Sequence, residues 1–306
     1  MGPQSIADKV PNLSGKTAIV TGANSGLGFE ISKVLASKGA RVVMACRDEY
    51  KAKIAADEIR KGNHNADVMV RSLDLANLAS VEQFVAEFNS AETKLHLLIN
   101  NAGLMAIIES RTVDGFEMQF GVNHLGHFAL TAMLMPTLLL TPESRIVSMS
   151  SSAHRQGKMD FADLMYESRP YSRWGAYAQS KLANLLFILE LNRQLGVSSQ
   201  TKALAAHPGV AKTKLGQNAR GIIGFGFRVS APLIAHSALK GAMPALRAAT
   251  DPHAKGGQYY GPRFMIVGRP VVEPPSLQAQ NFEDAERLWN ISENLTGKQF
   301  PNLTRW

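Results

Sequence analysis

The sequence predicts an α/β fold in which one doubly wound parallel sheet carries helices on both faces. Short apolar, β-branched runs alternate with helix-like segments over the first two thirds of the chain. Such repetition builds parallel sheets through right-handed crossovers. No linker rich in Pro, Gly or Ser divides the 306 residues. We therefore expect a single domain over residues 1–306, with a less regular C-terminal third.

The expected elements follow this alternation from the start of the chain. KTAIVTG (16–22) has the composition of a buried strand, and LGFEISKVLASKG (27–39) has the spacing of a helix that ends at glycine. The other expected segments are strands at 40–46, 66–74 and 95–103 and helices at 49–62, 80–89 and 286–297, the last ending at Gly297.

The composition restricts the possible classes of function. Hydrophobic residues make up 45% of the chain and charged residues 19%, so we expect a packed core and no extended disorder. The net charge of +8 would suit nucleic acid, an anionic membrane or an anionic cofactor. The Lys and Arg residues are spread out, however, and no zinc-ligand spacing occurs. We therefore expect no nucleic-acid partner and no metal, and we favour a cofactor that carries phosphate.

The cysteine content and the N-terminal segment bear on the compartment. Cys46 is the only cysteine, which excludes an internal disulfide and fits a reducing compartment. Residues 1–15 contain no apolar run of the kind found in signal peptides or anchors, and the longest apolar stretch, 128–140, is too short to cross a bilayer. We therefore expect a cytoplasmic protein.

A glycine-rich turn, TGANSGLG (21–28), stands between the first strand and the first helix. Gly22, Gly26 and Gly28 would let the backbone bend there and let a pyrophosphate approach the free N–H groups of the helix N-terminus. A glycine-rich turn alone is a weak signal, but this one lies directly after the first strand, where a dinucleotide site is expected.

A tyrosine and a lysine stand four residues apart in YAQSK (177–181). On a helix such residues are neighbours, about 5–6 Å apart at Cβ. An ammonium about 4 Å from a phenol, at an effective dielectric constant near 20, contributes about 4 kcal/mol. That would lower the phenol pKa from about 10 by up to roughly three units. We therefore expect Tyr177 to titrate near neutrality, as a general acid–base should, although an isolated pair of this kind is most often a solvated helix face.

Five motifs together resemble the short-chain dehydrogenase/reductase family over residues 14 to 215. In order, they are TGANSGLG, NNAG (100–103), SSSAH (150–154), YAQSK and HPGVAKT (207–213). The residues SSSAH and AYAQSKLAN are similar to the corresponding sequences of the retinol-dehydrogenase-like branch of that family. The resemblance implies a Rossmann fold and a hydride transfer between a nicotinamide cofactor and a carbonyl or alcohol. It also implies that a homodimer or homotetramer is possible.

The resemblance implies four catalytic residues. Ser151 would donate a hydrogen bond to the substrate carbonyl oxygen, and Tyr177 would protonate that oxygen as hydride arrives at carbon. Lys181 would also hold the nicotinamide ribose. Asn123, in VNHLGHF (122–128), would hold a water molecule that relays protons to the lysine.

The same resemblance implies a cofactor site along the glycine turn and the strand ends that follow it. Asp74 would contact the adenine amino group, and Thr213 would reach the nicotinamide amide or the phosphates. The full expected set is Gly22, Asn24, Ser25, Gly26, Leu27, Gly28, Arg47, Asp74, Leu75, Asn101, Ala102, Gly103, Tyr177, Lys181, Pro208, Gly209, Val210 and Thr213.

The end of the second strand, MACRDE, indicates which nicotinamide cofactor is used. NAD-dependent enzymes place an acidic residue there to bind the ribose 2′-hydroxyl, but here Cys46 takes that place and Arg47 follows. A guanidinium can chelate a 2′-phosphate that a carboxylate would repel. We therefore predict NADP(H). The alternative is that Arg47 only pairs with Asp48 or Glu49.

Residues 214–236 predict the class of substrate. Four glycines stand there among large apolar residues, with Arg220 and Arg228 nearby. Such a segment could form a mobile lid near the C-terminus that lines a pocket or touches a membrane surface; the alternative is an ordinary packed helix pair. The spacer 155–174 and Met105 would add apolar side chains. Because an apolar pocket leaves hydroxyl groups unpaired at about 1–3 kcal/mol each, we expect a lipophilic aldehyde or ketone, or its alcohol.

Other functions remain compatible with this sequence. One is another reaction on the same scaffold, such as pigment reduction or epimerisation, although the pigment-reducing relatives carry a cysteine near the catalytic tyrosine and Cys46 is far from it in sequence. Another is a catalytically retired NADP-sensing protein, which the presence of both Tyr177 and Lys181 disfavours. We expect His154 and His207 to be structural, because the tyrosine already supplies the acid.

Overall fold

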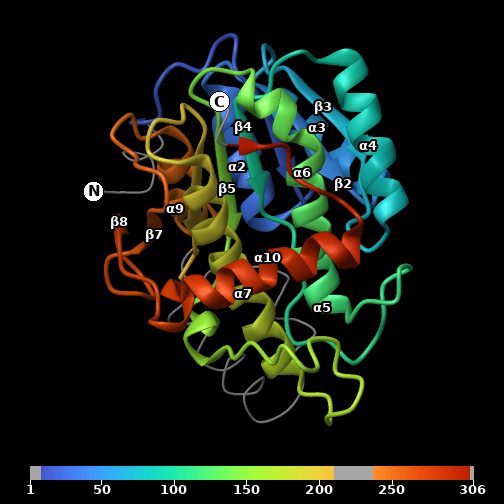
Figure 1. Cartoon of the computed structure of the whole chain (residues 1–306). Coiled ribbons are helices and arrows are strands. Elements are labelled where there is room, and N and C mark those ends of the chain that lie inside the picture. Colours follow the sequence, from blue (N-terminus) through green and yellow to red (C-terminus); the bar gives the residue numbers. More distant parts are fainter. Residues whose placement is uncertain (1–7, 210–236, 304–306) are drawn as a thin grey trace.

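The predicted parallel sheet forms the centre of the protein (Figure 1) in a computed structural model that describes residues 8–209 and 237–303. The strands are β1 (Thr17–Thr21), β2 (Arg41–Cys46), β3 (Val68–Ser72), β4 (Leu97–Asn100), β5 (Arg145–Met149), β6 (Lys202–Ala206), β7 (Tyr259–Pro262) and β8 (Pro270–Val272). Within the described residues they form one sheet in the order β3-β2-β1-β4-β5-β6-β7-β8. Neighbours from β3 to β7 are parallel, and β8 runs antiparallel to β7. The order reverses between β1 and β4, and ligands bind beside such a switch at the carboxyl ends of the strands.

Helices cover both faces of this sheet, as the alternation predicts (Figure 1). One layer contains α2 (Gly26–Ser37), α3 (Glu49–Gly62) and α9 (Ala238–Thr250), and the other contains α4 (Leu78–Ala91), α6 (Gly126–Leu139), α7 (Arg173–Leu195) and α10 (Phe282–Thr296). Successive residues of β1 supply the two cores in turn: Ile19 packs under α4 and α6, whereas Ala18 and Val20 pack under α2 and α9. The period of two expected of a strand buried on both faces is therefore present.

The ends of α10 agree in part with the sequence. Gly297 follows its last residue with a φ of +64°, a conformation that glycine adopts freely at helix ends. The helix begins four residues earlier than expected, at Phe282, because the side chain of Asn281 accepts hydrogen bonds from the backbone N–H groups of Glu283 and Asp284.

Two features near the site were not predicted. The short helix α5 (Met118–Phe120) continues into a π-helical turn, Gly121–Leu125, which carries Asn123. Such turns occur often at functional sites. The second feature is the hairpin of β7 and β8, whose strands are short and contain Pro262 and Pro270.

Some expectations concern segments that the structure does not describe. The expected lid at 214–236 and the cofactor residues Val210 and Thr213 lie outside the described residues. Among the helices that are described, none combines the length and the apolarity needed to cross a bilayer.

Candidate active site

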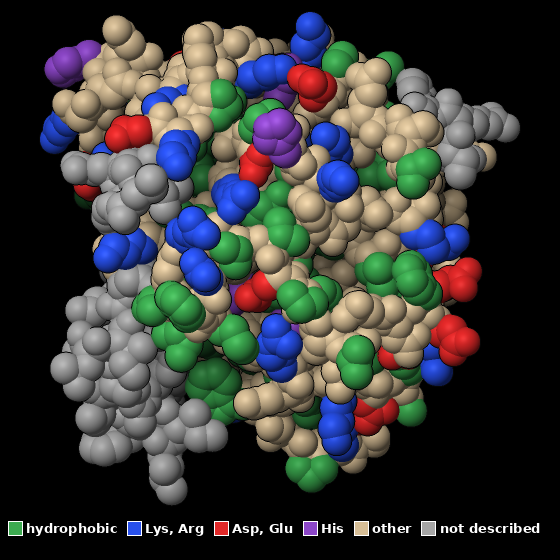
Figure 2. All heavy atoms as spheres, turned by 90° about the vertical axis from the view of Figure 1, so that its left-hand side faces the viewer, with side chains coloured by type: hydrophobic (Ala, Val, Ile, Leu, Met, Phe, Trp, Pro, Cys, Tyr) green, Lys and Arg blue, Asp and Glu red, His purple; other side chains and the backbone are tan. Residues whose placement is uncertain are grey.

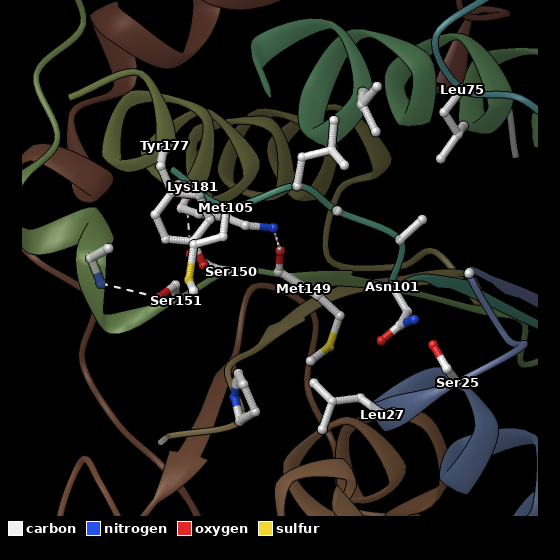
Figure 3. A pocket seen from close by; sticks show the side chains of 18 of the residues that line it. Ser25, Leu27, Leu75, Asn101, Met105, Met149, Ser150, Ser151, Tyr177 and Lys181 are labelled. Atoms are coloured by element: carbon white, nitrogen blue, oxygen red, sulfur yellow. Dashed lines mark hydrogen bonds between the residues drawn. The ribbon is translucent and has the colours of Figure 1, made fainter. Parts of the chain in front are cut away.

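A cavity of about 1250 Å³ lies at the carboxyl ends of the strands and reaches from the glycine turn to Tyr177. Figure 3 shows Ser25 and Asn101 at one end of this cavity and Ser151, Tyr177 and Lys181 at the other. Of the expected site residues that the structure describes, two do not line the cavity, namely Gly28 and Asn123. The others do: Gly22, Asn24, Ser25, Gly26, Leu27, Arg47, Asp74, Leu75, Asn101, Ala102, Gly103, Ser151, Tyr177, Lys181, Pro208 and Gly209.

The glycine turn has the geometry of a phosphate cradle. Gly22 and Gly26 have φ values of +64° and +58°, in the left-handed region that favours glycine. A Cβ atom on Gly28 would lie 2.4 Å from the carbonyl oxygen of Gly22, so this glycine lets α2 pack against the turn. Ser25 caps α2 without a side-chain hydrogen bond, which leaves the first N–H groups of the helix available to an anion. These residues therefore fit a dinucleotide.

Thr21 connects the glycine turn to the NNAG segment, a role that we did not predict. Its hydroxyl oxygen accepts hydrogen bonds from the backbone N–H groups of Asn101 and Ala102, both at 2.9 Å. The amide of Asn101 in turn donates to the carbonyl oxygen of Thr21 at 2.8 Å. The ring of buried His127 contacts the same hydroxyl at 2.9 Å. Thr21 opens the quoted TGANSGLG motif, but its side-chain contacts depend on residues far along the chain.

Arg47 lies exposed at the rim of the cavity near the end of β2. The neighbouring carboxylates have other partners: Asp48 pairs with Lys51, and Glu49 pairs with Lys53 at 3.4 Å. Within the described part of the chain, the guanidinium of Arg47 forms no ion pair. Burial raises the pKa of the Cys46 thiol to about 11, so this side chain adds no negative charge where a 2′-phosphate would lie.

Tyr177 and Lys181 lie together on α7, and both are buried. The Nζ atom of Lys181 is 5.9 Å from the centroid of the Tyr177 ring and donates a hydrogen bond to the carbonyl oxygen of Met149 at 3.1 Å. Ser150 is buried, and its hydroxyl donates to the carbonyl oxygen of Lys181 at 2.8 Å. Ser151 lines the cavity, and its hydroxyl is a hydrogen-bond partner of the Tyr177 phenol. The structure therefore brings Ser151, Tyr177 and Lys181 to one place.

The expected pKa of Tyr177 is wrong for this structure. Burial raises the pKa of the phenol above its ordinary value, and the hydrogen bond with Ser151 opposes this only in part. Burial also lowers the pKa of Lys181, to about 8. The expectation from the sequence considered only the attraction between the Lys181 ammonium and the Tyr177 phenolate. In the folded protein both groups are removed from water, and this disfavours phenolate and ammonium alike. The phenol is therefore protonated at neutral pH, as a proton donor must be.

Asn123 is buried in the π-helical turn, beside the cavity but not on its wall. Its Oδ1 atom accepts a hydrogen bond from the N–H of Leu104 at 2.7 Å, and its Nδ2 atom donates to Ser180 on α7 at 2.8 Å. A Cβ atom on Gly103 would lie 3.1 Å from Asn123 Oδ1 and 3.3 Å from Lys181 Nζ. The structure thus brings Asn123 and Lys181 close together beside Gly103, and the water relay stays a prediction.

The cavity wall near Tyr177 carries apolar side chains beside polar ones such as Ser151 and Gln156. Met105 lines it, as expected, together with Trp174. Other apolar residues of the spacer 155–174 were expected there, but Met159, Phe161 and Met165 pack against the core instead. Met265 and Ile266, from the turn between β7 and β8, line the cavity and were not predicted, because they come close to the site only through the hairpin.

The two histidines near the site have structural partners. His154 Nδ1 contacts the carbonyl oxygen of Ser151 at 2.7 Å, and its Nε2 accepts a hydrogen bond from the N–H of Ser276 at 3.1 Å. His207 Nε2 contacts Glu273 at 2.7 Å. These contacts bind the end of β5 and the end of β6 to the segment after β8, which supports structural roles.

Residues 16–221 match the family described as short chain dehydrogenase. The chain belongs to the short-chain dehydrogenase family. It is therefore an oxidoreductase, and its family uses NAD or NADP. This short-chain dehydrogenase is 44% identical to human retinol dehydrogenase 12 over 93% of the chain and 87% of the relative, and 42% identical to human retinol dehydrogenase 13 over 95% and 87%.

A solved structure supports the fold of this short-chain dehydrogenase independently. The crystal structure of an uncharacterized protein from Mycobacterium Paratuberculosis matches it with a TM-score of 0.81 and 42% sequence identity. The match covers 96% of this chain and 98% of the other. The two human relatives bear out the resemblance to the retinol-dehydrogenase-like branch.

Proposed function

We propose that this protein reduces a lipophilic aldehyde or ketone with NADPH and also catalyses the reverse oxidation of the alcohol. The observation that carries the proposal is that one continuous cavity joins the glycine turn to the buried pair of Tyr177 and Lys181. NADPH would supply the hydride when bound. The glycine turn, the Asn101–Gly103 segment and Lys181 would hold it.

The chain's own residues would handle the proton. Tyr177, protonated at neutral pH because burial raises the pKa of its phenol, would donate to the substrate carbonyl oxygen. Ser151 would hold that oxygen by a second hydrogen bond. The ammonium of Lys181, close to the ring of Tyr177, would stabilise the phenolate that forms. Asn123 would fix the NNAG segment and α7 around this group through its bonds to Leu104 and Ser180.

The preference for NADPH rests on Arg47, which has no ion-pair partner within residues 8–209 and 237–303. A guanidinium and a phosphate form a strong charge-assisted pair. Replacing Arg47 by Ala should lower kcat/KM for NADPH by at least about tenfold, since hydrogen bonds to charged groups contribute about 1.5–3 kcal/mol. The rate with NADH should change little. An Arg47→Ala enzyme that keeps its preference for NADPH would refute the assignment.

The proposal of a lipophilic substrate rests on the wall formed by Met105, Trp174, Met265 and Ile266. The names of the two human relatives suggest retinal as one compound to test. Comparing kcat/KM for retinal or a long-chain aldehyde with that for a polyhydroxylated carbonyl of similar length tests the idea. A clear preference for the polyhydroxylated compound contradicts it. A cytoplasmic location and a homodimer or homotetramer belong to the same proposal.

A further inference from the structure

The turn between β7 and β8, RFMIVGR (263–269), exposes an unbroken run of apolar side chains. All seven residues are exposed, and the exposed fractions are 68% for Phe264, 43% for Met265, 42% for Ile266 and 39% for Val267. A scattered exposed apolar residue needs no explanation, but four in succession are unusual on a surface that faces only water.

The backbone of this turn is held by its own hydrogen bonds. The N–H of Phe264 donates to the carbonyl oxygen of Val267 at 3.1 Å, and the N–H of Met265 donates to Pro262 at 2.8 Å. The N–H of Ile266 donates to Phe264 at 2.7 Å. Satisfied donors lower the cost of moving a backbone out of water. Met265 has a φ of +61°, and a side chain held in that region often has a functional reason.

Basic residues flank the apolar run. Arg263 and Arg269 stand at its two ends, both exposed, and their backbone atoms pair at 3.0 Å. Figure 2 shows the side of the molecule that carries β7 and β8, where Lys and Arg side chains outnumber Asp and Glu. Apolar side chains between basic ones are typical of segments that lie in the interface of an anionic bilayer.

The same turn borders the cavity. Met265 and Ile266 line the cavity, as does the basic residue Arg155, while Phe264 and Val267 are exposed and do not line it. A surface that contacts lipid here would place the cavity mouth against the phase in which an apolar carbonyl compound dissolves. This continuity favours a lipid surface over a protein partner.

We propose that the β7–β8 turn, residues 263–269, docks the protein on anionic membranes, with Phe264 and Val267 inserted among the lipids and Arg263 and Arg269 at the headgroups. The proposal extends the proposed use of a lipophilic substrate. Its test measures binding without substrate, so the failure of either idea can be told from the failure of the other.

Sedimentation with phospholipid vesicles tests the apolar contact. Wild-type protein should bind vesicles of phosphatidylcholine and phosphatidylglycerol. The double variant Phe264→Ser/Val267→Ser should bind at least about tenfold more weakly, because burying such side chains contributes more than the roughly 1.4 kcal/mol that a factor of ten represents. The matched control is Leu140→Ser. Leu140 is 64% exposed and lies between α6 and the start of β5, at the amino ends of the strands and away from the cavity, so its replacement should leave binding unchanged.

The arginines are tested with the same vesicles. Arg263→Gln and Arg269→Gln should each weaken binding about fivefold, whereas Lys61→Gln, an exposed residue at the end of α3, should not. Turnover of a water-soluble carbonyl compound should be unchanged in the Phe264/Val267 variant. Lack of wild-type binding, equal binding to pure phosphatidylcholine, or equal binding by the double variant overturns the proposal. So does a wild-type dimer that the double variant converts to monomer, because the turn would then join two copies.

Discussion

The burial of Lys181 predicts that its replacement by Met makes the folded protein more stable while it removes activity. Burial lowers the pKa of this ammonium from 10.5 to about 8, and a shift of that size disfavours the folded state at pH 7 by at most about 3 kcal/mol. Met is unbranched and can occupy the space of the lysine stem. The carbonyl oxygen of Met149 keeps a donor, because Asn184 Nδ2 also lies 3.0 Å from it.

The effect should depend on pH in a defined way. The unfolded lysine keeps its proton up to about pH 10.5, whereas the folded one releases it above about pH 8. The cost of burying the charge is therefore complete below pH 8, declines between these values and vanishes above the higher one. The stability gained in Lys181→Met over wild type should follow the same course.

Urea unfolding of both proteins over this pH range measures the gain, and NADPH titration with steady-state rates measures the lost function. Lys202→Met is the control. Lys202 also donates to a backbone carbonyl, that of Ala254 at 3.0 Å, but it is only half-buried, so no gain is expected. If Lys181→Met is less stable than wild type at pH 7, or if its gain does not change with pH, then the ammonium is not held at a cost and the reasoning fails.

Three further predictions concern the site and the core. Tyr177→Phe should lower turnover at least ~100-fold with NADPH affinity nearly intact; a variant that keeps more than about a tenth of the rate contradicts the acid role. Gly28→Ala should lower the free energy of unfolding by about 1–3 kcal/mol and weaken NADPH binding, because the new Cβ meets backbone at 2.4 Å. In the control Gly62→Ala the new Cβ meets nothing within 4 Å, so this change should raise the free energy of unfolding by about 0.4–1 kcal/mol. If the two glycine variants change the free energy of unfolding equally, the packing role of Gly28 is refuted. Burial lowers the pKa of His127 and His154 to about 4. Between pH 6.5 and 4 these histidines are therefore protonated in the unfolded chain but not in the folded protein. As the pH falls through that window, each histidine should lower the free energy of unfolding by up to about 3 kcal/mol. Urea unfolding that shows constant stability there contradicts this.

The parts of the site that the sequence predicts are those encoded by neighbouring residues. The glycine turn lies next to its strand and helix, and Tyr177 and Lys181 are one helical turn apart, so spacing alone brings them together. Their pKa values could not be predicted in this way, because burial depends on packing by distant segments. The contacts of Thr21 with Asn101 and the approach of Met265 to the cavity likewise depend on strand pairing. No local sequence pattern predicts which strands pair, and a strand of three residues such as β8 is too short to show a periodicity.

The short strand β8 also decides what can happen at that end of the sheet. β7 would otherwise present a row of unpaired N–H and C=O groups, to which a strand of a second molecule could add. Instead, Tyr260, Gly261 and Pro262 pair with residues of β8. The outer side of β8 is a poor template, because it begins at Pro270 and is followed closely by Pro274 and Pro275. The protein can therefore expose apolar side chains in the adjoining turn without offering a backbone edge on which chains could stack into aggregates.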